Sequence, residues 1–118
     1  MPFHHQSSIG PQFTVVAITG EAMLDAFAEL VEQVGRSSRE RGDKRMLVDL
    51  RAVQGSLAFT EQFRLGQIVA SELRHLQRLA SVVPEDKITR TSEKVAQSMG
   101  VQLRVFTSAA QARSWLSD

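Results

Sequence analysis

The stretch Met46-Leu-Val-Asp-Leu50 decides the fold of this 118-residue chain. Four of its five residues are apolar, and a short run of this kind is typical of a strand buried on both faces of a parallel sheet. Gly42 ends the helical pattern before it, and Gly55 begins a turn after it. We therefore predict that residues 46–50 form the central strand of an α/β domain.

On the N-terminal side of this strand, the apolar residues change from a strand-like to a helix-like period. Residues 13–19 are rich in β-branched side chains and predict a strand. A helix is expected from about residue 20 to residue 41, because apolar residues then recur at spacings of three and four. Residues 1–12 contain Gly10 and Pro11, and we expect either an edge strand antiparallel to residues 13–19 or a flexible N-terminus.

The same alternation continues on the C-terminal side, where a proline, a glycine or a hydroxyl side chain bounds each element. The expected elements are a helix over 59–74 capped by Ser56 or Thr60, a strand over 79–83, a helix between Pro84 and Gly100, a strand over 101–106 and a last helix capped by Thr107. Together these elements predict one domain over residues 1–118. Its fold class is α/β, a βα superhelix with a mainly parallel sheet of four or five strands.

The helices are expected to bury one side each. Phe63 and Val69 belong to the predicted apolar face of the helix over 59–74, and Ile88 and Met99 belong to that of the following helix. In the last helix, Trp115 lies on the apolar side, so we expect the C-terminus to be docked on the sheet.

The composition argues against several classes of protein. Fourteen Lys and Arg oppose 13 Asp and Glu, so the net charge is +1 and no global field would attract nucleic acid or anionic lipid. The absence of cysteine rules out disulfides and thiolate metal sites. No window approaches the roughly 18 apolar residues of a membrane span, and the N-terminus lacks the apolar run of a signal peptide. We expect a cytoplasmic protein that binds no nucleic acid.

The residues that could support catalysis do not form a recognisable set. His4 and His5 lie in the N-terminal segment, and His75 follows a helix, where a solvated imidazolium would interact favourably with the helix dipole. Asp49 could act as an acid at the end of the strand, but we favour hydrogen bonds to turn amides or a pair with an arginine. No glycine-rich phosphate loop is present. We expect no enzyme activity, no cofactor and no metal.

The stretch over residues 36–45 contains five basic and two acidic side chains. Cations at the C-terminal end of a helix are favoured by its dipole. The stretch contains no aromatic residue that could stack on a base. We therefore interpret it as a solvated helix end.

The segment between the central strand and the second helix is the candidate site, because α/β folds place their sites at the carboxyl ends of parallel strands. Gly55 allows close backbone approach, and Ser56 and Thr60 offer hydroxyl groups near free helix amides. Arg51 or Arg64 could neutralise an anion there. The alternative is that capping and turn formation account for the glycine and the hydroxyls without any ligand.

Three segments carry a family resemblance: Met46-Leu-Val-Asp-Leu-Arg-Ala-Val53, Leu79-Ala-Ser-Val-Val83 and the ending Val105-Phe-Thr-Ser-Ala-Ala-Gln-Ala-Arg-Ser-Trp-Leu116. With them the chain resembles the STAS-like superfamily, the bacterial anti-sigma factor antagonists, in a cytosolic branch. The resemblance implies a βα superhelix related in shape to the lipid-binding CRAL-TRIO domain.

For function, the resemblance implies a non-enzymatic regulatory module that binds a protein partner, with a second copy of the chain as one candidate. In that superfamily, a serine at the start of the helix after the Asp-Leu strand is phosphorylated. Here the aligned position is near Phe59, and Ser56 and Thr60 are only its neighbours, so the serine switch is expected to be absent. The alternative function is binding of a small anionic or lipidic ligand at the candidate site.

Overall fold

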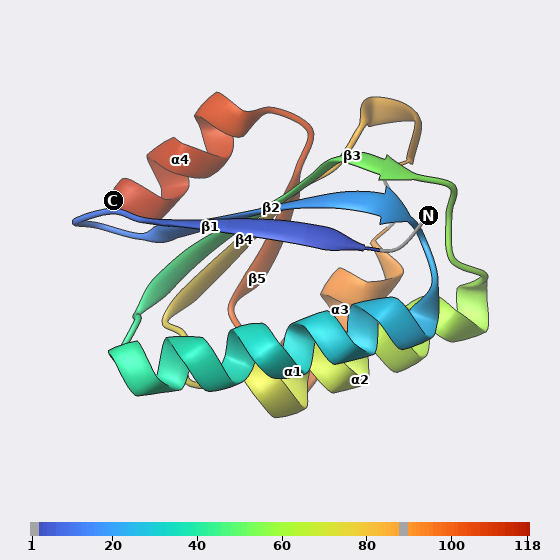
Figure 1. Cartoon of the computed structure of the whole chain (residues 1–118), viewed down its shortest axis with the longest axis horizontal. Helices are drawn as coiled ribbons and strands as arrows, with labels where there is room; N and C mark the ends of the chain where they lie inside the picture. The colour runs from blue at the N-terminus through green and yellow to red at the C-terminus, as the bar shows by residue number, and fades with distance from the viewer. Residues whose placement is uncertain (1–2, 88–89) are drawn as a thin grey trace.

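Five strands form one sheet, and their order in space is their order in the chain (Figure 1). This computed structural model describes residues 3–87 and 90–118. The strands are β1 (His4–Ile9), β2 (Thr14–Glu21), β3 (Arg45–Gln54), β4 (Arg78–Val82) and β5 (Leu103–Phe106). Strand β1 pairs antiparallel with β2, and all the other pairs are parallel. The expected α/β fold and its antiparallel N-terminal edge strand are confirmed.

Helices cover both faces of this sheet, as Figure 1 shows. One face carries α1 (Leu24–Arg41) and α2 (Phe59–Leu73), which run side by side, with α3 (Thr91–Ser98) packed against α2. The other face carries α4 (Ala109–Ser117). A short 3₁₀ turn, Glu85–Lys87, follows β4. This two-sided cover is what allows β3 and β4 to be apolar on both faces.

The side chains of the central strands alternate between two apolar clusters. In β3, Met46 and Val48 point to the α1 and α2 side, whereas Leu47 packs with Ala112 and Leu116 of α4. Met46, Leu47 and Leu116 are essentially inaccessible to solvent. The last helix is therefore docked on the sheet, as its apolar side predicted.

Helix α1 begins later in the chain than the sequence predicted. Glycine and glutamate at positions 20 and 21 continue β2 by pairing with Val53 and Gln54 of β3, so the helix begins at Leu24 rather than near residue 20. The Ala22 amide also donates to the Gln54 carbonyl at 2.7 Å. Strand β3 itself runs four residues beyond the predicted end at Leu50. A register shift between β2 and β3 accommodates this extension.

Other corrections lie at the helix ends. Ser108, not Thr107, caps α4, because its hydroxyl accepts a hydrogen bond from the Gln111 amide at 3.2 Å. The third helix, predicted between Pro84 and Gly100, extends from Thr91 to Ser98. Met99 is 39% exposed and Ile88 lies outside the described residues, so the stripe expected along this helix is not confirmed.

Candidate functional site

An apolar cavity of about 190 Å³ lies between the sheet and the helices α1, α2 and α3. Its walls include Ile18 and Leu50 from the strands and Phe27, Val31 and Val69 from the helices. The cavity follows from the alternation of β3, because every second side chain of a strand in a parallel sheet faces the same helix layer. It reaches the carboxyl ends of β2, β3 and β4, the edge at which α/β folds place their ligands.

Four polar side chains interrupt this apolar lining: Ser56, Gln62, Ser81 and Ser92. The Gln62 amide donates to the Leu57 carbonyl at 2.9 Å. Among the described residues that line the cavity, none is charged. The site therefore favours an apolar molecule with few polar groups.

The five predicted site residues do not lie together in the structure. Gly55 and Ser56 line the cavity, and Gly55 has a φ of +79°, a conformation that suits glycine in a turn. Arg51 was expected in the loop after the central strand, but it lies within β3. Its guanidinium binds the Asp49 carboxylate at 2.8 and 3.0 Å, and its amide donates to the same group.

Asp49 follows Leu47 by two residues and so shares the α4 face of β3. The hydrogen bonds from Arg51 hold the pKa of Asp49 below its usual range, and Arg113 of α4 acts in the same direction. The favoured interpretation, an aspartate paired with an arginine, is confirmed. Arg51 is thus committed to a carboxylate on the face of the sheet opposite the cavity.

The remaining candidates, Thr60 and Arg64, lie on the exposed side of the first turns of α2. Neither Thr60 nor Ser56 caps this helix, which was the expected role of one of them. Ala58 is the N-cap residue, and its amide donates to the Glu61 carboxylate at 2.9 Å. A glutamate at the third helical position can accept a hydrogen bond from a free amide at the start of the helix. Neither the Ser56 nor the Thr60 hydroxyl is therefore needed as a cap.

A model of the family described as SpoIIAA-like matches residues 13–117, nearly the whole chain. The chain belongs to the SpoIIAA-like family. The match confirms the resemblance to the STAS-like superfamily, and it leaves only the N-terminal residues, with strand β1, outside the shared region. No curated protein matches the chain in sequence.

Two solved structures have the same fold as this SpoIIAA-like protein. An anti-sigma factor antagonist from Mycobacterium paratuberculosis superposes with a TM-score of 0.71 at 15% identity, over 98% of this chain and 95% of that one. A DUF3478-family protein with a SpoIIAA-like fold, from Shewanella loihica, superposes with a TM-score of 0.59 at 16% identity, over 98% and 93% of the two chains. At these identities the likeness establishes the fold alone.

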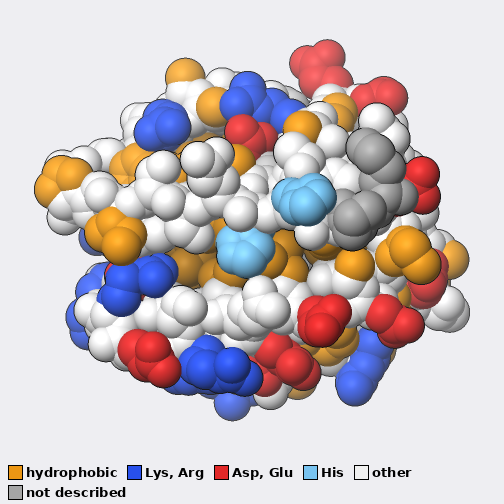
Figure 2. All heavy atoms as spheres, in the orientation of Figure 1, with side chains coloured by type: hydrophobic (Ala, Val, Ile, Leu, Met, Phe, Trp, Pro, Cys, Tyr) orange, Lys and Arg blue, Asp and Glu red, His pale blue; other side chains and the backbone are white. Residues whose placement is uncertain are grey.

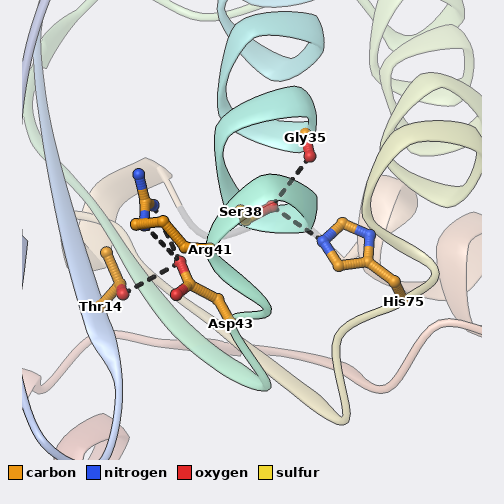
Figure 3. A network of polar contacts seen from close by, with 6 residues as sticks. All are labelled: Thr14, Gly35, Ser38, Arg41, Asp43 and His75. Atoms are coloured by element: carbon orange, nitrogen blue, oxygen red, sulfur yellow. Dashed lines mark hydrogen bonds and ion pairs between the residues drawn. The ribbon is translucent and has the colours of Figure 1, made fainter.

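A polar network at the other end of this SpoIIAA-like domain corrects the interpretation of His75 (Figure 3). The ring is half-buried, and its Nε2 lies 2.8 Å from the hydroxyl of Ser38, a fully buried residue of α1. That hydroxyl donates to the Gly35 carbonyl at 3.0 Å, so it accepts from an Nε2–H group. Burial lowers the pKa of His75, as does the nearby Arg39. His75 is therefore a half-buried, hydrogen-bonded side chain whose lowered pKa favours the neutral ring, rather than a residue free in solvent.

The basic stretch over residues 36–45 was expected to be a solvated helix end, but several of its side chains bind other groups of the protein. Arg39 donates to the Glu72 carbonyl at 2.9 Å, and Arg41 binds the Asp43 carboxylate at 2.8 Å. Arg45 donates to two carbonyls at the end of α4, each at 2.6 Å. Figure 2 shows acidic and basic side chains interspersed on the face in view. Three of the five basic side chains in this stretch therefore form hydrogen bonds or ion pairs with other residues of the domain.

Two aromatic side chains at the start of α2 are exposed to solvent. Phe63, which the sequence places on the apolar face of this helix, is 46% exposed, and Phe59 one turn earlier is 69% exposed. Residues four apart lie on the same side of a helix, so both rings project from the first turns of α2. Exposed large apolar side chains of this kind are uncommon when adjacent, and they mark a candidate contact surface.

Two structural features are absent from the described part of the chain. No three His, Asp or Glu side chains there lie close enough together to hold a metal ion. No helix within residues 3–87 and 90–118 combines the length and the apolar character that crossing a bilayer requires.

Proposed function

We propose that this SpoIIAA-like protein is a non-enzymatic regulatory module that responds to a small apolar ligand held beneath its sheet. The cavity of about 190 Å³ carries this proposal. An engineered apolar cavity of roughly 150 Å³ binds benzene, so a space of this size suits a ligand of a few carbon atoms more. Of the residues predicted at the site, Gly55 and Ser56 are the proposed ligand contacts.

Ligand binding to the folded state raises the stability of a protein in proportion to the logarithm of ligand concentration. We expect saturating toluene to raise the melting temperature of the wild-type protein by several degrees. Val69→Phe adds volume inside the cavity and should reduce this shift. Val15→Phe is the matched control, because Val15 packs on the α4 side of the sheet.

The proposal would be wrong if toluene and other small apolar compounds left the melting temperature of the wild-type protein unchanged. An equal shift in wild type and Val69→Phe would also contradict it, because the ligand would then bind elsewhere. Chemical unfolding of both variants without ligand establishes that each remains folded.

A second candidate function is the binding of a protein partner through the start of α2. The exposed rings of Phe59 and Phe63 favour it, and the exposed Thr60 and Arg64 beside them would extend the same surface. The related structure named as an anti-sigma factor antagonist supports a partner of protein type. A second copy of this chain is the simplest partner to test.

Sedimentation velocity over a range of concentrations tests self-association, and co-purification tests other partners. We expect Phe59→Ser to abolish the association that the wild-type protein shows. Met99→Ser removes another exposed apolar side chain at the end of α3 and should leave the association intact. Equal association of Phe59→Ser and wild type would exclude this surface.

A further inference from the structure

The residues that line the cavity restrict the charge that a ligand can carry. None of the described residues that border it is Lys, Arg, His, Asp or Glu. A buried charge without a partner is strongly unfavourable, because the ion loses its hydration and gains no compensating interaction. A carboxylate or an ammonium group within this cavity would be such an unpaired buried charge. The chemistry of the walls therefore disfavours the anionic ligand that the sequence suggested.

Ser81 provides a polar group inside this apolar lining. Its neighbours across the ladder are Val48 of β3 and Val105 of β5, which both also border the cavity. Strands inside a parallel sheet are usually apolar at such positions, so a serine between two valines makes less apolar contact than a third valine would. Among the described residues, its hydroxyl has no hydrogen-bond partner, and it retains some accessible surface. The hydroxyl is thus free to bind a molecule in the cavity.

Ser92 offers a second hydroxyl from the first turn of α3. It is half-buried, and it also has no side-chain hydrogen bond to another described residue. The other two polar side chains of the lining differ from this pair. Gln62 is tied to the Leu57 carbonyl, and Ser56 is exposed in the loop before α2. Ser81 and Ser92 are therefore the half-buried hydroxyls of the lining that can bind the oxygen of a ligand, whereas Ser56 borders the ligand from the exposed loop.

From these observations we propose that the ligand is an uncharged amphiphile, an alcohol, aldehyde or ketone of about six to nine carbon atoms. Its apolar chain occupies the space between the sheet and helices α1 and α2. Its single oxygen hydrogen-bonds to the hydroxyl of Ser81, with Ser92 as a second donor or acceptor. This inference rests on the proposed function, because it specifies the ligand of the same cavity.

Three probes with seven carbon atoms each separate the two proposals: toluene, 1-heptanol and heptanoate. Amide chemical-shift titrations at pH 7.5 give the affinity of each probe for the wild-type protein and for the variants. We expect 1-heptanol to bind at least tenfold more tightly than heptanoate. Ser81→Ala should weaken 1-heptanol about three- to tenfold, as expected for the loss of one hydrogen bond, and should leave toluene unchanged.

Ser114→Ala is the matched control, since Ser114 is exposed on α4 on the other side of the sheet. It should not change the affinity of any probe. Ser92→Ala tests the second hydroxyl, with an expected smaller loss of 1-heptanol affinity.

The outcomes distinguish failure of the ligand class from failure of the proposed function. If toluene and 1-heptanol both fail to bind, the cavity is not a ligand site and both proposals are wrong. If heptanoate binds as tightly as 1-heptanol, the neutral ligand is refuted while the cavity remains a site. Equal weakening of toluene and 1-heptanol by Ser81→Ala would refute the hydrogen bond to Ser81.

Discussion

The pair formed by Ser38 and His75 joins the ends of two neighbouring helices through one hydroxyl group. Ser38 accepts from the imidazole and donates to the Gly35 carbonyl, so the fully buried hydroxyl is satisfied in both roles. The neutral imidazole suits this arrangement, because burial and the nearby Arg39 both disfavour the cation. At this position the packing of two helices lowers the pKa of a side chain.

This arrangement predicts a pH dependence of stability. The pKa of His75 is lower in the folded state than in the unfolded chain, where it is about 6.5. Below that value the unfolded state binds more protons, so the free energy of unfolding should fall as the pH decreases from 7.5 to 5.5 and should be insensitive to His75 above about 7.5.

Urea unfolding of the wild type and of His75→Gln at these pH values measures the effect. Glutamine keeps a donor for Ser38 but does not titrate, so the variant should show a smaller loss of stability between pH 7.5 and 5.5. An identical pH dependence in the two proteins would show that His75 is not linked to folding.

At the scale of elements, α3 is held by a glycine on one side and a carboxylate on the other. Gly66 of α2 lets α3 approach so closely that an added Cβ would lie 2.8 Å from Val95 Cβ and 2.9 Å from the Ser92 carbonyl oxygen. On the other side, the buried Glu93 accepts from the Val105 amide of β5 at 2.7 Å and from Arg90 at 2.8 Å. These contacts position Ser92 at the cavity.

We predict that Gly66→Ala destabilises the protein by about 1 to 2 kcal/mol. Overpacking typically costs about 1 to 3 kcal/mol, and the better helix propensity of alanine returns about 1 kcal/mol at most. Chemical unfolding measures the change. Ser71→Ala at an exposed position of the same helix is the control and should be neutral or slightly stabilising. A stabilising effect of Gly66→Ala would mean that α3 packs less closely than the structure indicates.

At the scale of the whole molecule, the sheet couples two apolar clusters that lie on its opposite faces. Strands β3 and β4 contribute side chains to both clusters, so neither cluster can be lost without exposing the strands to water. Arg45 adds a link of another kind, because it begins β3 and binds carbonyl groups at the end of α4. Both features favour folding as a single domain.

Cooperative unfolding is the corresponding prediction. Trp115, the single tryptophan, reports on α4, whereas far-ultraviolet circular dichroism is dominated by the longer helices α1 and α2 on the other face. Urea unfolding curves from fluorescence and from circular dichroism should coincide. Separate midpoints would show that the two faces unfold independently and would contradict the single domain.

Local sequence patterns determined most of the architecture. The apolar run at Met46 to Leu50 predicts a buried central strand, and the alternation of periods around it predicts the βα order, because both depend on neighbouring residues along the chain. Segments of the same kind carry the resemblance to the superfamily. The pairing of Asp49 with an arginine could also be predicted from the sequence, since residues two apart in a strand, such as Asp49 and Arg51, share a face.

Only the tertiary structure decided the site. The register of β3 against β2 extended the strand through Arg51 and placed that arginine on the face away from the cavity, a consequence of long-range pairing. The cavity itself brings together residues from three helices and four strands, including Ser81 and Ser92, which no local pattern connects. Likewise, the exposure of Phe63 and the burial of Ser38 depend on how closely helices pack, and that distance is not encoded in the spacing of residues within one helix.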